Sequence, residues 1–366
     1  MTGRFGAGPA STIGVEEELM ILDAASLDEV PAVERLLARV DESSLPGRLK
    51  TELFASVFET NTEPMERADG LDASLRALRR AAAEAAEADG LAIAAAGSHP
   101  FADPEAQVVV DEERYTSFVD YGGVSVRRQG VQGLHVHVAM ASGEECWRCL
   151  ELVLPWLPVV LALSANSPWL RGRLTGMASN RAPVLVELPR AGVPPAFASY
   201  AEWESWVERL ARLRVADDHT RLWWDARPHP TFGTLEVRMP DQPTDVRLSV
   251  AFAALLQALC VTALEGRLPG RSALLGDRGR ADYAQNRWAA ARFGPRAELL
   301  HPDGRTIATA AALGAELLEL VRPAARALGS EALVERIDPT TCEADRQAAF
   351  ASPLEAAADL VARSLG

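Results

Sequence analysis

The chain has 366 residues, 48% of them hydrophobic, and a formal net charge of −14 at pH 7. This acidity argues against nucleic-acid or anionic-membrane partners, which require a basic surface. Its four cysteines are too few for a disulfide framework, and Cys146 and Cys149 form an isolated C-x-x-C without the further ligands of a zinc site.

The N-terminal segment and the apolar stretches indicate the cellular location of the protein. Residues 1–14 carry one arginine and no apolar core, which is unlike a secretory signal. Residues 150–165 form the longest apolar stretch, but Glu151, Pro155 and Pro158 interrupt it, so it is shorter than the roughly 20 clean residues of a membrane span. We therefore expect a buried helix at 150–165 and a cytoplasmic protein.

Strand-like runs occupy the first two thirds of the chain, with helical patterns between them. The runs are 12–22, 53–62, 91–97, 133–140, 183–188 and 232–239. The helical patterns are 30–40, 66–89, 144–165, 200–215 and 245–264. After residue 270 the pattern is almost wholly helical, over 282–293, 306–328 and 353–365.

These elements predict an α+β fold. Strands spread over 12–239 without a linker favour one sheet, and hence a single domain over 1–366 with a helical region at 245–366. Polar residues alternate along the strands, which favours a mainly antiparallel sheet, since buried parallel strands read as continuous apolar runs. The sequence has neither a G-x-G-x-x-G nor a G-x-x-x-x-G-K-[ST] motif for a nucleotide.

Three strands repeat one pattern, with polar residues at i and i+2 and apolar residues between them. The pairs are Glu16 and Glu18, His135 and His137, and Glu236 and Arg238. Because strand side chains alternate, each pair shares one face, and Glu17 takes the other. An ordinary half-solvated strand explains any one pair, but a plain solvent face usually mixes in Ser, Thr and Lys. If the strands are neighbours, their carboxylates repel one another, and bound cations would relieve that cost.

The segment 50–64 adds Glu52 and Glu59, seven residues apart. A helix would align them over two turns, whereas a regular strand would put them on opposite faces. Apolar residues at 53, 54, 57 and 58 suit a helix, and residues 60–62 suit a strand. We expect a helix-to-strand transition with Glu59 near the junction; a plain amphipathic element is the alternative.

Lys50 is the only lysine among the 37 basic residues. Lysine carries a compact, strongly hydrated charge that arginine does not reproduce. Lys50 is therefore a candidate for a position where only an ammonium works, although chance explains its uniqueness equally well.

A carboxylate-rich site selects hard divalent cations over zinc, and a histidine among the glutamates favours tolerance of Mn²⁺ beside Mg²⁺. Such an acidic surface commonly holds a polyphosphate through its metal ions. We therefore expect ATP and Mg²⁺ as cofactors, with Arg238 and Lys50 as catalytic phosphate-binding residues.

At these residues the chain resembles the glutamate–cysteine ligase type 2 family of bacterial carboxylate-amine ligases. The matching stretches are GVEEELMILD from Gly14, KTELFASVFETNT from Lys50, GLHVHV from Gly133, ALSANSPW from Ala162, PRAGVPP from Pro189, WWDARPHPTFGTLEVRMPD from Trp223 and NRWAAARFG from Asn286. The resemblance implies a glutamine-synthetase-like fold, in which an antiparallel sheet forms a half-funnel with helices on its outer face. It also implies a homodimer.

The resemblance further implies a reaction and residue roles. An acid would be activated by ATP as an acyl phosphate and captured by an amine, with small amino acids or amines as partners. The implied metal ligands are Glu16, Glu18, Glu52, Glu59, His135 and Glu236. The candidate substrate-binding residues are Arg181, Arg190 and His137. Between the two arginines the chain reads APVLVEL where we expect a tryptophan, which leaves the bound amino acid open.

Three alternatives remain. The first is the same chemistry on a different amino acid, a peptide terminus or another amine. The second is a metallohydrolase built on His135 and His137, which would need further ligands at strand ends. The sequence shows no such context for the remaining histidines, which are His99, His219, His229 and His301. The third is a non-catalytic nucleotide or metal sensor, against which the full set of acidic residues counts.

Overall fold

The fold is built around a seven-stranded antiparallel sheet, seen in a computed structural model that describes residues 3–269 and 276–366. Its strands are β1 (Ile13–Asp23), β2 (Gly47–Thr51), β3 (Val57–Thr62), β4 (Leu91–Ala94), β5 (Leu134–Ala139), β10 (Ala226–His229) and β11 (Thr234–Val237). Their order is β10-β11-β5-β1-β3-β2, and β4 also pairs with β1. The predicted antiparallel α+β architecture is confirmed.

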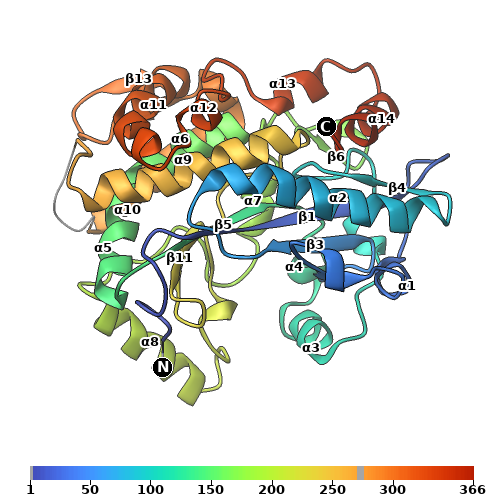
Figure 1. Cartoon of the computed structure of the whole chain (residues 1–366), viewed down its shortest axis with the longest axis horizontal. Helices are drawn as coiled ribbons and strands as arrows, with labels where there is room; N and C mark the ends of the chain where they lie inside the picture. The colour runs from blue at the N-terminus through green and yellow to red at the C-terminus, as the bar shows by residue number, and fades with distance from the viewer. Residues whose placement is uncertain (1–2, 270–275) are drawn as a thin grey trace.

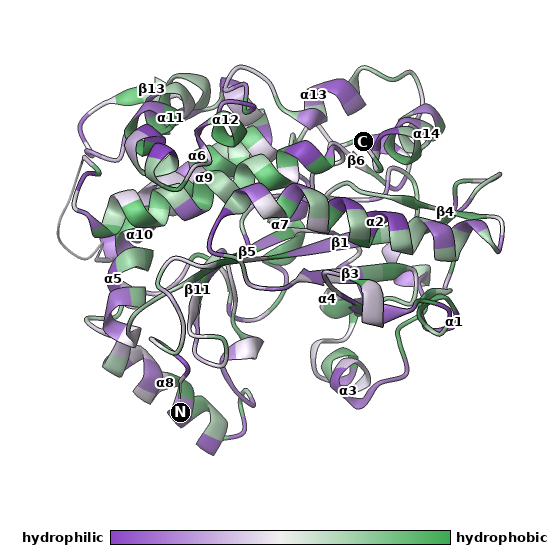
Figure 2. Ribbon diagram, viewed as in Figure 1, coloured by the Kyte–Doolittle hydropathy of each residue, from purple (hydrophilic) through white to green (hydrophobic). Residues whose placement is uncertain are grey.

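Helices cover one face of this sheet (Figure 1). The helices α2 (Leu71–Glu87) and α9 (Val246–Leu264) lie side by side across it. A further layer consists of α5 (Gly143–Val153), α6 (Leu157–Ser164), α10 (Asp277–Phe293) and α11 (Ala310–Ala327). Figure 2 shows hydrophobic residues gathered on α6 and on much of α9, where the helices pack together. This apolar core leaves the opposite face of the sheet free for polar side chains.

The opposite side of the sheet is flanked by α3 (Glu113–Gly122) and α8 (Tyr200–Arg212) (Figure 1). The remaining helices are short: α1 (Val33–Leu37), α4 (Val124–Arg127), α7 (Arg181–Leu185), α12 (Glu331–Val334), α13 (Glu343–Ala348) and α14 (Pro353–Arg363). Two-stranded pairings join β6 (Trp169–Leu170) to β7 (Arg173–Leu174), β8 (Ala191–Gly192) to β9 (Trp223–Trp224), and β12 (Glu298–Leu300) to β13 (Ile307–Thr309). Most of the chain after residue 245 is helical, as predicted.

Two helical stretches, Gly143–Ser164 and Val246–Leu264, are long and apolar enough to cross a membrane by length and composition. In each, 83% of the most apolar 18-residue segment is buried inside the fold. The first contains the stretch 150–165, which forms buried helix as predicted. Burial of this extent is typical of core helices, so these stretches are weak evidence for a membrane.

Two local predictions were wrong. Residues 183–188 do not form a strand, because 181–185 form α7; Pro183 sits in its first turn, where its missing N–H breaks no helical hydrogen bond. The segment 50–64 contains no helix. It ends β2, makes a turn and forms β3, while Leu53 and Phe54 turn into the core from the connection. Short apolar runs fit helix and strand alike, and tertiary packing decided between them.

Candidate active site

The register of the sheet brings the predicted polar residues together on its open face. The directly opposed pairs are Glu18 and Glu59, Glu16 and His135, and Glu236 and His137. Directly opposed residues of antiparallel strands have Cβ atoms about 5 Å apart. The six side chains therefore form one continuous cluster over β3, β1, β5 and β11.

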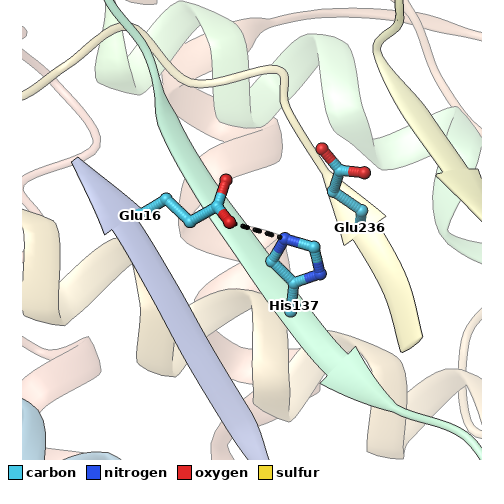
Figure 3. A group of neighbouring side chains, drawn as sticks. All are labelled: Glu16, His137 and Glu236. Atoms are coloured by element: carbon cyan, nitrogen blue, oxygen red, sulfur yellow. Dashed lines mark ion pairs between the residues drawn. The ribbon is translucent and has the colours of Figure 1, made fainter. Parts of the chain in front are cut away.

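The centre of the cluster is formed by Glu16, His137 and Glu236 (Figure 3). One ligand atom from each lies within 4.8 Å of the other two, and this is the only such group of three among the described residues. The Nε2 atom of His137 is 3.5 Å from Glu16 Oε1, and Glu236 faces the ring from the neighbouring strand. The structure thus places His137, predicted to bind substrate, in the best-formed candidate metal group.

Glu16 is held ionised by its neighbours. Burial alone would raise the pKa of Glu16, but His137 and His135 keep that pKa well below its ordinary value. His135 Nδ1 lies 3.2 Å from Glu16 Oε2, and Asn61 Nδ2 donates to Glu16 Oε1 at 2.9 Å. Burial, assisted by the charge of Arg238, lowers the pKa of His135 to about 4, so its ring is neutral at pH 7 and retains a lone pair.

The negative charge of Glu236 is balanced by two arginines. Arg227 Nε donates to Glu236 Oε2 at 2.6 Å, and Arg238 Nη1 donates to Glu236 Oε1 at 2.5 Å. Burial would raise the pKa of Glu236, but these two guanidinium groups hold it well below its ordinary value. Arg238 thus lies inside the cluster, where it was predicted to act.

Glu18, Glu52 and Glu59 form a second acidic group, in which the pKa values are raised and not lowered. Burial raises the pKa of Glu18 to about 7. Burial and the charges of Glu59 and Glu18 raise the pKa of Glu52 well above its ordinary value, and burial with the charge of Glu16 raises that of Glu59. A raised pKa lets a carboxyl keep its proton to a higher pH, and a cation bound beside it would displace that proton.

The donor set fits a hard divalent cation. Carboxylate oxygens predominate, and the described residues of the cluster include two imidazoles and no thiol, which suits Mg²⁺ or Mn²⁺ better than a zinc site. The Nε2 atoms of His135 and His137 are buried and make no hydrogen bond within the described residues. His135 Nε2 lies 3.9 Å from Glu18 Oε1 and His137 Nε2 lies 3.5 Å from Glu16 Oε1, so each nitrogen faces a carboxylate with which it could share a cation.

Two cavities meet at the cluster. The first, about 510 Å³, is lined by residues 4–9, the beginning of β1 and parts of β3 and β5. The second, about 380 Å³, is lined by five carboxylates, five arginines and three aromatic residues, among others. Glu16 and His137 line both cavities. The two cavities therefore adjoin at these two side chains.

The other predicted residues fall in different places. Lys50 lines the first cavity, and its Nζ lies 3.7 Å from Glu59 Oε1. Arg181 lines the second cavity, is 2% exposed, and donates to the carbonyl oxygen of Arg238 at 3.0 Å. Arg190 lines neither of these two cavities. Its guanidinium donates instead to Tyr121 Oη at 3.2 Å and to a backbone carbonyl.

Gly133, which opens the stretch GLHVHV, makes room for Arg181. A Cβ atom at this position would lie 2.1 Å from Arg181 Nη2, so a side chain here would force the Arg181 guanidinium to move. The backbone N–H of Gly133 also donates to Glu18 Oε2 at 2.6 Å. The glycine thus allows a buried arginine and a candidate metal ligand to approach the same point of the backbone.

Sequence reasoning missed several residues of the site. Arg227 and His229 line the second cavity from β10, and they follow the same i, i+2 pattern as the predicted pairs. The sequence pattern did not predict this strand, because Pro228 lies between them and proline is rare in strand interiors. Two of the other histidines lie close to this site: the His229 ring lies 5.3 Å from that of His137 and 4.7 Å from that of His219.

The sequence profile described as Glutamate-cysteine ligase family 2 (GCS2) matches residues 12–346. The chain belongs to this family. A protein of Rubrobacter xylanophilus provisionally named glutamate–cysteine ligase 2-3 is 40% identical over 352 residues, 95% of this chain and 94% of the relative. One of Herpetosiphon aurantiacus provisionally named glutamate–cysteine ligase 2 is 36% identical over 329 residues, 89% of this chain and 84% of the relative.

Solved structures share the fold. The glutamate–cysteine ligase of Francisella tularensis, crystallised with AMP, superposes with a TM-score of 0.71 at 13% identity, covering 98% of this chain and 89% of that one. The bifunctional glutathione synthetase of Pasteurella multocida gives 0.72 at 14% identity, covering 97% of this chain and 52% of that one. The predicted glutamine-synthetase-like fold class is confirmed. As a family member, the chain is an ATP-dependent ligase that forms carbon–nitrogen bonds.

Proposed function

We propose that this ligase activates a carboxylic acid as an acyl phosphate and captures it with an amine to form an amide. The observation that carries this proposal is the meeting of two cavities at Glu16 and His137, with Arg238 and a carboxylate cluster beside them. A two-substrate phosphoryl transfer needs two binding spaces joined at one charged point. Positioning and charge neutralisation then supply most of the catalysis.

The two cavities differ in a way that suggests their occupants. The first has a mostly apolar wall with Lys50 and Asn61 near the cluster, which suits a nucleotide whose base is buried and whose phosphates point inward. The second carries most of the charge, which suits polar substrates. We assign ATP to the first cavity, and the acid and the amine to the second.

In this arrangement an oxygen of the donor carboxylate attacks the γ-phosphorus, and ADP leaves. The amine nitrogen then attacks the acyl carbon, phosphate leaves, and the nitrogen loses a proton. Arg238 lies where it can stabilise the negative charge that develops on the transferring phosphoryl group, since its guanidinium is held by Glu236 beside Glu16. Arg181, buried with its Nε unpaired among the described residues, is placed to bind a substrate carboxylate.

The residues that would hold Mg²⁺ are Glu16, Glu18, Glu52, Glu59, Glu236 and the imidazoles of His135 and His137. Bound there, divalent ions neutralise phosphate charge. The family name refers to glutamate and cysteine as substrates of its members. For this chain we propose a cytoplasmic location and a single domain on the sequence pattern, and a homodimer on the family resemblance.

The test is ADP release from purified protein with Mg²⁺, measured for pairs of an amino acid and an amine, with the amide product identified by mass. Release should require both substrates and should be lost in Glu16→Gln. Glu84→Gln, an exposed change on α2 outside the site, is the matched control and should retain activity. ADP release that is independent of any amine would contradict a ligase.

A binding assay separates this proposal from a metallohydrolase or a sensor. Mg²⁺ together with a non-hydrolysable ATP analogue should raise the melting temperature more than the sum of either alone, because ions and phosphates bind as one unit. Equal stabilisation by zinc without nucleotide would favour the hydrolase, which would draw on His229, whose ring lies near those of His137 and His219. Binding without any ADP release across the substrate panel would favour the sensor.

A further inference from the structure

The second cavity has an apolar side that the chemistry described so far does not use. We call it the apolar wall, and it consists of Leu53, Phe118, Val131, Leu185, Leu188 and Trp223. These residues come from five separate parts of the chain, including α3, α7 with the residues after it, and β9. Phosphoryl transfer needs charge and hydrogen bonds, so a wall of this kind serves another purpose.

The wall contains a stacked aromatic pair. The rings of Phe118 and Trp223 are 4.6 Å apart with 13° between their planes, and the guanidinium of Arg221 lies 5.5 Å from the centre of the Phe118 ring. Phe118 is buried and Trp223 is half-buried. Rigid stacked rings present a large apolar surface at little entropic cost, which is typical of a surface that binds an apolar group.

Two large apolar residues next to the wall in the sequence are exposed at the molecular surface. Tyr121 on α3 is 56% exposed, and Val186, directly after α7, is 48% exposed. Each follows a wall residue in the same segment, Phe118 and Leu185 respectively.

A buried acceptor beside the wall points to a ligand. Gln129 lines the second cavity and is 8% exposed, and its Nε2 donates to the carbonyl oxygens of Ser125 at 2.8 Å and Val184 at 3.1 Å. Its Oε1 makes no hydrogen bond among residues 3–269 and 276–366. A flipped amide would set Oε1 against two carbonyl oxygens, so the orientation is determined. A ligand N–H would satisfy the acceptor.

We propose that the amine substrate of this ligase carries a large apolar side chain, aromatic or branched aliphatic, which packs against the apolar wall while Gln129 Oε1 accepts an N–H of the same molecule. The inference rests on the proposed function. The acid must place its carboxylate among Arg238, Arg181 and the metal-binding glutamates, so the apolar side of the cavity is left for the amine. Specificity for such an amine follows from burial of its side chain.

The experiment measures kcat/KM for ADP release with each of phenylalanine, leucine, alanine and cysteine as the amine, at a saturating concentration of whichever acid supports turnover. Phenylalanine or leucine should exceed alanine and cysteine by at least about tenfold, the gain expected from burying a large apolar side chain. Trp223→Ala should raise KM for the large amines about tenfold and change KM for alanine less than threefold. Trp288→Ala, an exposed change on α10, is the matched control.

The outcomes separate the two proposals. Turnover with cysteine or alanine equal to that with phenylalanine and leucine overturns this inference and leaves the ligase function standing. Absence of turnover with every acid and amine contradicts the proposed function. In that event, the wild-type protein and Trp223→Ala are each titrated calorimetrically with phenylalanine and with alanine. The inference predicts that the wild type binds phenylalanine more tightly than alanine and that Trp223→Ala loses this preference. Any other result overturns it.

Discussion

Glu17 and Arg79 form a buried ion pair on the helix-covered face of the sheet, directly behind the cluster. Arg79 Nη2 lies 2.5 Å from Glu17 Oε1, and Nε lies 2.9 Å from Glu17 Oε2. Both side chains are fully buried, and Arg79 also donates to three backbone carbonyl oxygens. The pair ties β1, which carries Glu16 and Glu18 on its other face, to α2.

Arg79→Met should lower the free energy of unfolding by about 3–5 kcal/mol, because it leaves the Glu17 carboxylate buried without its partner. Urea denaturation measures the change. Arg80→Met, at the exposed neighbouring position on α2, is the matched control and should change stability by less than about 0.5 kcal/mol. A similar loss in both variants would mean that the ion pair contributes nothing specific.

Glu52→Gln and Glu236→Gln should both abolish turnover but shift metal-free stability in opposite directions. Burial and neighbouring carboxylates raise the pKa of Glu52, so its ionised form destabilises the fold, and a permanently neutral amide raises the melting temperature at an alkaline pH at which Glu52 ionises. Glu236 compensates Arg227 and Arg238, so its loss leaves two buried guanidinium groups and lowers the melting temperature. Calorimetry in EDTA checks this, and shifts of the same sign would contradict it.

In the metal-free protein, the contribution of Glu18 to the free energy of unfolding should decrease as the pH rises from 5 to 8. The pKa of Glu18 is raised from 4.5 to about 7, so the folded state holds a proton in this window that the unfolded state has released. That contribution is complete below about pH 4.5 and disappears above pH 7. His99, whose pKa burial lowers to about 4, acts in the opposite direction as the pH falls below 6.5.

The variant Glu18→Gln isolates this effect, because both proteins share His99. The difference in free energy of unfolding between the wild type and the variant should change with pH by up to about 1.4 kcal/mol per unit between pH 5 and 7. Chemical denaturation at several pH values in EDTA gives the two curves. Parallel curves would show that Glu18 does not titrate in this range.

Lys50→Arg should lower kcat, and Lys50→Met should lower it further, by about 10²-fold. The ammonium lies in the first cavity at 3.7 Å from Glu59, where a flexible point charge can follow a phosphoryl group and a planar guanidinium cannot. Arg48→Met, an exposed change two residues earlier on β2, is the control. Steady-state kinetics with a working substrate pair decide, and an unchanged kcat in both Lys50 variants removes Lys50 from the mechanism.

The sequence by itself determined which side chains share a face of each strand. Period-two alternation is a local property of extended backbone, so the pairing of Glu16 with Glu18 and of His135 with His137, and the opposite direction of Glu17, followed without a structure. The family was also readable from motifs spread along the chain. The acidic site and the fold class could therefore be predicted.

Only the tertiary structure decided which strands are neighbours and what each side chain meets. The order β10-β11-β5-β1-β3-β2 brought Arg227 to Glu236, placed Lys50 in a different cavity from Arg181, and left Arg190 outside both cavities. Strand order depends on long-range packing, which no local pattern contains. For the same reason residues 181–185 became helix and 52–56 became a turn, since burial against the rest of the fold outweighed their local preference.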